Sequence, residues 1–190
     1  MHVVKELESI FISGSIRIRR LDARFTERVS NAIMSGMKVV VGDADGADTS
    51  IQSYLMSIGA NNVNVYCSGE FPRNNLGDWD VKNIFPDAPI GTRAYYTAKD
   101  LSMAEVASFG LMVWDSKSTG TLSNVIRLLE EKKKSVVFVN KSKTFFNVSD
   151  GRSLLRLVEN MSEVAKIKAN SKIGLAKKIE AFCPPQPSFI

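Results

Sequence analysis

Gly110-Leu-Met-Val-Trp-Asp115, followed by Ser116-Lys-Ser-Thr-Gly-Thr121, is the stretch of sequence that decides the fold. It predicts a buried strand and a tight polar loop, and the apolar residues after it have helical spacing: Leu122, Val125, Ile126 and Leu129. N–H groups at the start of a helix are unpaired and the helix dipole is positive there, so this loop favours a bound anion. A phosphate or a polar sugar fits that position, and a helix start that is merely capped is the alternative.

The remaining chain alternates in the same way. Further short apolar strands are predicted within 10–13, 37–42, 62–67 and 135–140, with amphipathic helices between them. The stretch from Ser68 to Gly91 is rich in proline and glycine, so we expect it to be a long loop. After Asn140 we expect two helices, one capped by Ser149 or Asp150 and one from about Ser171 to Phe182.

This alternation predicts an α/β protein with a Rossmann-like, three-layer α/β/α architecture and a mainly parallel sheet. With 190 residues, the chain is long enough for one core but short for two. We expect a Rossmannoid domain over 1–145, and a helical C-terminal extension over 146–190 that packs on this domain or on a partner subunit.

Composition excludes several classes of function. The single histidine, His2, leaves no His-based zinc site and no Ser-His or Cys-His nucleophile pair. No apolar run is long enough to span a bilayer, and the first ten residues lack a secretory pattern. Two distant cysteines suit a reducing compartment, so we expect a cytoplasmic protein without a membrane partner.

The net charge of +5 is unevenly distributed along the chain. Residues 1–140 contain 16 basic and 16 acidic residues, whereas 141–190 contain 9 and 4. A basic C-terminal segment could contact nucleic acid. Its basic residues are spaced out and lack interleaved aromatics, however, so a solvated helix face is the favoured interpretation and nucleic acid the less favoured partner.

Polar loops follow the first, second and fourth of these predicted strands. Parallel strands place such loops at one edge of the sheet, where ligands of α/β proteins bind. The candidate ligand-binding residues at this edge are Gly14, Ser15, Arg17, Gly42, Asp43, Gly46, Lys99, Asp115, Ser118, Thr119, Gly120, Thr121 and Asn124. Arg73, Asn74 and Asn75 of the long loop could close over a ligand.

Three motifs in this order resemble the SLOG superfamily of Rossmannoid proteins, which includes the DprA-like, LOG-like and YspA/YpsA-like branches. They are Val41-Gly-Asp-Ala-Asp-Gly-Ala-Asp48, Lys99-Asp-Leu-Ser-Met103 and Ser118-Thr-Gly-Thr121. The resemblance covers about residues 9–140 and is nearest to the YspA/YpsA-like branch. It implies binding of nucleotides, nucleotide-derived ligands or nucleic acid at the edge of the sheet.

One departure from the catalytic LOG pattern bears on function. Three residues after Thr121, where LOG-type phosphoribohydrolases carry a catalytic glutamate, this chain has Asn124. A neutral amide can act neither as a base nor as a nucleophile. The sequence therefore favours a nucleotide- or nucleoside-binding domain, a sensor or an accessory module, over an enzyme.

Two alternative functions stay open at this stage. A hydrolase of an N-glycosidic or phosphoester bond would use Asp115, Asp43 or Asp100 as its carboxylate. The second alternative is a single-stranded nucleic-acid binder of DprA type. For the assembly state, a homodimer is left open. Neither a cofactor nor a metal site is predicted, because Asp43, Asp45 and Asp48 lack the frame of a calcium loop.

Overall fold

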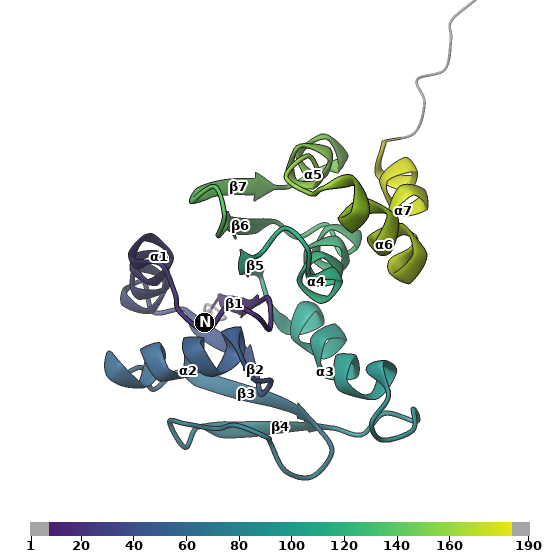
Figure 1. Cartoon of the computed structure of the whole chain (residues 1–190). Helices are drawn as coiled ribbons and strands as arrows, with labels where there is room; N and C mark the ends of the chain where they lie inside the picture. The colour runs from purple at the N-terminus through teal and green to yellow at the C-terminus, as the bar shows by residue number, and fades with distance from the viewer. Residues whose placement is uncertain (1–7, 184–190) are drawn as a thin grey trace, which may run out of the picture.

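The computed structural model describes residues 8–183, which form one sheet with helices on both faces (Figure 1). In this range the strands are β1 (Ser9–Gly14), β2 (Lys38–Gly42), β3 (Val63–Ser68), β4 (Asp80–Ile84), β5 (Phe109–Trp114), β6 (Ser135–Val139) and β7 (Thr144–Val148). The helices are α1 (Ala23–Met34), α2 (Ala47–Ser57), α3 (Arg93–Val106), α4 (Thr119–Glu130), α5 (Gly151–Val158), α6 (Glu163–Ile173) and α7 (Leu175–Phe182).

The sheet has the strand order β4-β3-β2-β1-β5-β6-β7. All neighbouring strands are parallel except β6 and β7, which are antiparallel. In the centre, Ile12 pairs with Val41 on one side and with Leu111 on the other. The prediction of a Rossmann-like α/β fold with a mainly parallel sheet is confirmed.

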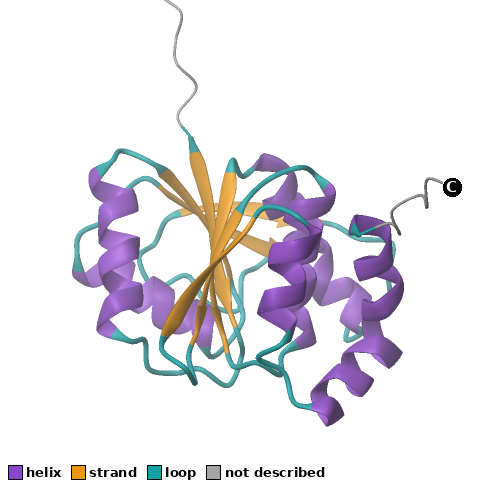
Figure 2. Cartoon of the chain, turned by 90° about the horizontal axis from the view of Figure 1, so that it is seen from above, coloured by secondary structure: helices purple, strands orange, loops and turns teal. Residues whose placement is uncertain are grey.

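Helices cover both faces because the central strands are apolar on both sides. The strands lie between two helical layers when viewed from above (Figure 2). One core contains Phe25 of α1 and Leu55 of α2, and the other contains Met103 of α3 and Leu122 of α4. Helix α5 contacts β7, while α6 contacts α4 and α7.

Two strands were not predicted. Strand β4 lies inside the stretch expected to be a loop, and it pairs with β3 at the edge of the sheet, where Val81 lies opposite Val65. The side chains of β4 are exposed or half-buried, so the strand is stabilised by backbone pairing with β3 rather than by burial of apolar side chains. Strand β7 forms a hairpin with β6, and the turn between them contains neither glycine nor proline. Lys143 adopts the positive φ, 57°, in this turn.

The C-terminal helices differ in part from the prediction. Asp150 caps α5 by accepting a 2.7 Å hydrogen bond from Ser153 N, as expected. The helix predicted from about Ser171 to Phe182 is present as α7, which ends at Phe182 but begins at Leu175, after the left-handed Gly174. Helix α6, from Glu163 to Ile173, was not predicted. Helix α6 buries only Ala165 and Ala169, so it has no apolar stripe that would reveal it.

The division into two units remains a prediction. The boundary expected after residue 145 lies within β7, and residues 1–7 and 184–190 of the two predicted units lie outside the described part of the chain.

Gly46 provides a test of the turn between β2 and α2. Its φ is +80°, and a Cβ there would overlap the carbonyl oxygen of Ile16, whereas Gly36 has a φ of +78° and open space around it. We expect Gly36→Ala to lower the free energy of unfolding by about 1 kcal/mol. Gly46→Ala adds a steric overlap and should cost about 3 kcal/mol or more, measured by urea unfolding. Equal losses would contradict this close contact.

Candidate functional site

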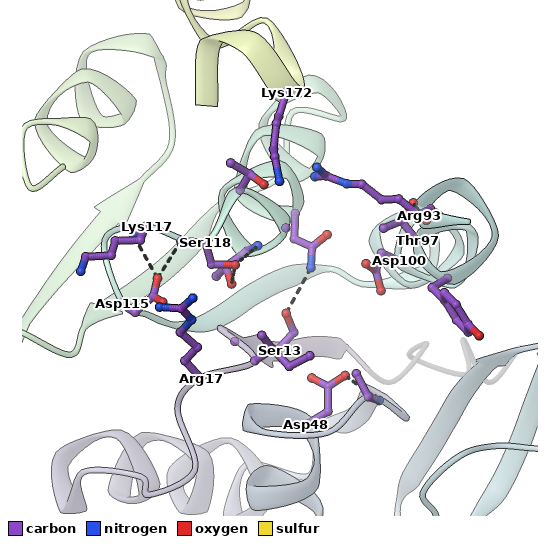
Figure 3. A pocket seen from close by; sticks show the side chains of 18 of the residues that line it. Ser13, Arg17, Asp48, Arg93, Thr97, Asp100, Asp115, Lys117, Ser118 and Lys172 are labelled. Carbon is purple, nitrogen blue, oxygen red and sulfur yellow. Dashed lines mark hydrogen bonds between the residues drawn. The ribbon is translucent and has the colours of Figure 1, made fainter. Parts of the chain in front are cut away.

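The loops after β1, β2 and β5 meet at the carboxyl edge of the sheet and enclose a cavity of about 480 Å³ (Figure 3). Helices α3 and α6 complete its walls. The lining residues are Ser13, Gly14, Ile16, Arg17, Ala44, Asp48, Arg73, Arg93, Tyr96, Thr97, Lys99, Asp100, Asp115, Lys117, Ser118, Thr119, Gly120, Thr121, Asn124, Lys168 and Lys172.

Asp115 organises the loop between β5 and α4. Its Oδ1 accepts hydrogen bonds from Lys117 N at 2.9 Å, Ser118 N at 2.7 Å and Ser15 Oγ at 3.1 Å. Ser118 then caps α4 by accepting a 3.3 Å bond from Thr121 N. This carboxylate oxygen is therefore engaged in holding the loop rather than free to contact a ligand.

Two backbone donors of this loop remain available at the cavity wall. Thr119 N and Gly120 N have no hydrogen-bond partner among residues 8–183, and both residues line the cavity. They are the first two N–H groups of a 12-residue helix, where the helix dipole is positive. Together they offer the kind of anion contact that the sequence predicts.

The β1 loop is tied to α4 by buried polar contacts. Ser15 Oγ and Thr121 Oγ1 share a hydrogen bond of 3.2 Å, and Asn124 Nδ2 donates to Ser13 Oγ at 3.1 Å. These four residues are at least nine-tenths buried. Asn124 and Ser13 thus belong to the floor of the cavity, and Ser15 lies beneath it.

A buried charge cluster forms the wall on the side of α2 and α3. Lys99 is only 3% exposed, and its Nζ lies 2.8 Å from Asp100 Oδ1 and 3.9 Å from Asp43 Oδ1. Asp43 also binds Arg73 through both carboxylate oxygens, at 2.8 and 3.2 Å. Asp48 accepts a bond from Ala44 N at 3.3 Å. Three carboxylates thus surround two cations, with a net charge of −1 when all are ionised.

The pKa values of the cluster follow from burial and pairing. Burial raises the pKa of Asp48 from 3.8 to about 6, against the lowering effect of Lys99. Burial also acts to raise the pKa of Asp43, but the hydrogen bonds from Arg73 outweigh it and the pKa is lowered. For Lys99, burial favours the neutral amine, yet the charges of Asp100 and Asp48 outweigh it and raise the pKa. Lys99 is therefore a charged structural group, not a nucleophile.

Five further cations stand around the mouth of the cavity. Figure 3 shows Arg17 and Lys117 on one side, and Arg93 and Lys172 reaching in from α3 and α6. Lys168 lies one turn before Lys172. None of the five forms an ion pair within the described residues. Their charge is available to an external anion.

The basic mouth continues into two adjoining hollows. A hollow of about 490 Å³ shares Arg17, Asp115 and Lys117 with the cavity and adds Arg19 and Arg20. A third, of about 560 Å³, shares Arg19 and Arg20 with the second. A basic path longer than the cavity itself therefore continues from the edge of the sheet toward α1 and α2.

Most of the predicted ligand residues lie together on the cavity wall. Those that line it are Gly14, Arg17, Lys99, Asp115, Ser118, Thr119, Gly120, Thr121 and Asn124. Those behind the wall are Ser15, Gly42, Asp43 and Gly46. Gly42 lies directly against Asp48 and Lys99, so no side chain fits there.

Sequence reasoning missed the cations of α3 and α6. Arg93 stands at the start of α3, and only the four-residue spacing of Lys168 and Lys172 hinted at a shared face. Arg73 and Asn74 do reach the edge, but they hold the loop itself: Arg73 pairs with Asp43, and Asn74 donates to Asp43 O at 2.8 Å. Asn75 binds Trp79 O at 2.8 Å and lies outside the cavity lining.

Residues 8–183 contain no cluster of three or more histidine, cysteine, aspartate or glutamate side chains that could hold a metal ion. Within the same residues, every helix is too short or too polar to cross a membrane.

The fold and this cavity define a Rossmann-like α/β protein with a basic pocket at the carboxyl edge of its sheet. Among solved structures, the chain resembles DNA processing protein A (DprA) from Helicobacter pylori, reported for its unique single-stranded DNA binding mode. The TM-score is 0.54 and the identity 16%, over 90% of this chain and 81% of that one. No protein-family model and no curated protein matches the chain. At this identity the likeness establishes a shared fold.

Asp48 gives the site a testable dependence on pH. Because the pKa of Asp48 is higher in the folded protein than the ordinary 3.8, the folded state holds a proton between about pH 4 and 6 that the unfolded state has lost. The free energy of unfolding therefore falls over this range as pH rises. An amide side chain does not titrate, so Asp48→Asn should gain stability relative to the wild type by about 1 to 3 kcal/mol from pH 4 to pH 7. Urea unfolding at several pH values measures this, and a difference independent of pH would contradict the raised pKa.

Proposed function

We propose that this chain binds single-stranded nucleic acid along the basic edge of its sheet. The observation that carries this proposal is a set of cations that form no ion pair among residues 8–183, from Lys168 and Lys172 through Arg17 and Lys117 to the hollow that contains Arg19 and Arg20. Phosphate groups dominate the affinity of proteins for nucleic acid, and a path of this kind can contact several of them.

The even charge of residues 1–140 does not weigh against this function. Basic and acidic residues balance along that part of the chain, but Arg17, Arg19, Arg20, Arg93 and Lys117 all line the cavity or the adjoining hollows. Helix α6 adds two lysines from the basic C-terminal segment. Positive charge is therefore concentrated on one surface rather than in one segment of the sequence. This arrangement favours binding of a polyanion, whereas the sequence favoured a solvated helix face without a partner.

The likeness to DprA supports this function without transferring it. That protein is reported to bind single-stranded DNA, and the two chains share a fold at 16% identity. Membership of the SLOG superfamily, and of its YspA/YpsA-like branch, remains a proposal that rests on the motifs around Gly42, Lys99 and Thr121. A homodimer and a cytoplasmic location also remain predictions.

A free nucleotide is the second candidate ligand. It is favoured by the size of the cavity, about 480 Å³, and by the acceptors Asp48, Asp100 and Asn124 on its inner wall. A hydrolase is not favoured by any observation. Asp43 pairs with Arg73, Asp100 pairs with Lys99, and Asp115 holds its loop.

Replacing the two lysines of α6 tests the nucleic-acid proposal. Both side chains are exposed, so Lys168→Ala/Lys172→Ala should fold normally. We expect about tenfold weaker binding of a fluorescent single-stranded oligonucleotide at low salt, and a less steep decline of log affinity with log salt, by about 0.7 per lost phosphate contact.

The matched control is Lys132→Ala/Lys134→Ala, which removes the same charge from exposed lysines that line a separate hollow beside Phe109. This control should bind as the wild type does. Equal weakening in both double variants would show that only net charge matters and would refute the proposed path.

A mononucleotide tests the second candidate. A 5′-mononucleotide at about 100 times its dissociation constant should raise the free energy of unfolding by about 2.7 kcal/mol, read as a thermal shift. Lys168→Ala/Lys172→Ala should reduce the shift at a fixed nucleotide concentration. A protein that binds oligonucleotides but shows no shift with mononucleotides would eliminate this candidate.

A further inference from the structure

The cavity has two ends of opposite chemistry. Its mouth presents Thr119 N, Gly120 N and the free cations, whereas its inner wall presents oxygen acceptors. Asp48 of α2 and Asp100 of α3 both line the cavity, and Figure 3 shows Arg93 on the same helix as Asp100 while Lys172 reaches in from α6. A ligand that fills the cavity must place an anion at one end and hydrogen-bond donors at the other.

Asn124 supplies an acceptor that has no protein partner. Its side chain is more than nine-tenths buried and lines the cavity, and Nδ2 is used by Ser13 Oγ. Oδ1 then has no hydrogen-bond partner among the described residues. Oδ1 is not among the fully buried side-chain atoms that lack a partner, so it is accessible from the cavity, where a ligand donor can bind it.

The carboxylates that line the cavity together with Asn124 disfavour a phosphate at this end. The cluster of Asp43, Asp48, Asp100, Lys99 and Arg73 has a net charge of −1 when Asp48 is ionised, and its cations already face carboxylates of the cluster. A phosphate placed against it would be repelled, whereas a hydroxyl group could donate a hydrogen bond to these oxygens.

The distance between the two ends fits a sugar. Asn124 lies four residues after Gly120 on α4, a rise of about 6 Å along the helix. In a nucleotide the sugar lies between the phosphate and the base, so its hydroxyls are the donors nearest to the phosphate. A phosphate at the start of α4 therefore places a sugar hydroxyl, rather than a base amino group, near Asn124.

We propose that the cavity binds a nucleotide with a free sugar hydroxyl at its inner wall, namely the 3′-terminal nucleotide of a single strand, with its 5′-phosphate at the mouth. This inference rests on the proposed function. An internal DNA nucleotide does not fit, because both of its sugar oxygens carry phosphates and one of them would face Asp48 and Asp100. The preceding phosphates of the strand lie along Arg17, Lys117, Arg19 and Arg20.

Strand ends of defined chemistry test the proposal on the wild-type protein. A linear deoxyoligonucleotide with a 3′-hydroxyl should bind at least about tenfold more tightly than the same strand with a 3′-phosphate or than a circular strand of equal length. A 5′-phosphate should not weaken binding. Equal affinity for all of these strands overturns the end preference but leaves the proposed function intact, whereas absence of binding to every strand overturns the proposed function itself.

Competition distinguishes a strand end from a free nucleotide as the natural source of the hydroxyl. Deoxyadenosine 5′-monophosphate should displace the strand, and deoxyadenosine 3′,5′-bisphosphate should do so more weakly. If the monophosphate competes as well as a short strand does, the strand beyond the terminal nucleotide adds nothing, and the strand-end assignment is overturned in favour of a free nucleotide.

Asn124→Leu removes the Oδ1 acceptor, together with the Nδ2 donor to Ser13, and keeps the branching of the side chain; Asn31→Leu makes the same change on the exposed side of α1. We expect the preference for a 3′-hydroxyl over a 3′-phosphate to fall about threefold or more in Asn124→Leu and to be unchanged in Asn31→Leu. An unchanged preference in a folded Asn124→Leu protein would contradict the role of Asn124. If this variant does not fold, the strand-end comparison on the wild type still decides the proposal.

Discussion

The pairing of the buried Lys99 ammonium group is the interaction on which the carboxyl edge of the sheet depends. A charge removed from water must be paired, and Lys99 meets this requirement with carboxylates from the β2–α2 turn and from its own helix. The same turn holds Arg73 through Asp43, which fixes the loop between β3 and β4. Lys99 and Arg73, which share Asp43, thus set the positions of α3, the turn and the loop, which together form one wall of the cavity.

The opposite wall, formed by the loop between β5 and α4, is held by hydrogen bonds from backbone N–H groups to side chains rather than by buried charges. Asp115 and Ser118 accept hydrogen bonds from backbone N–H groups that have no partner within the helix, and the Ser15 hydroxyl, which donates to the Asp115 carboxylate, links the ends of β1 and β5. Short polar contacts of this kind hold backbone donors in place without using them all, so Thr119 N and Gly120 N stay available. A rigid acidic wall therefore faces a wall that offers donors, and the contrast between them gives the cavity its polarity.

Much of the fold was predictable because five strands are short runs of buried, mainly apolar residues that end in turn-forming residues. Strands β4 and β7 were not predicted. The edge strand β4, Asp80–Ile84, has no buried apolar run and depends on backbone pairing with β3. The tight turn before β7 has a positive φ at Lys143 rather than at a glycine, so the sequence does not indicate it. The three loops of the site were predicted together, from the rule for parallel strands. Lys168 and Lys172 could not be, because their place at the cavity depends on how α6 packs against α4, through the small residues Ala165 and Ala169.

Because α6 supplies two cations of the cavity mouth, the parts of the site form in a definite order as the chain is synthesised. A chain that emerges from the ribosome can complete the strands of its sheet, the turn that carries Asp43 and the start of α4 before the lysines of α6 have been synthesised. The loops and the acidic wall would then exist while the mouth still lacks two of its cations. The positive charge at the mouth is therefore completed in two steps, first by Arg17, Arg93 and Lys117 and then by the two lysines of α6.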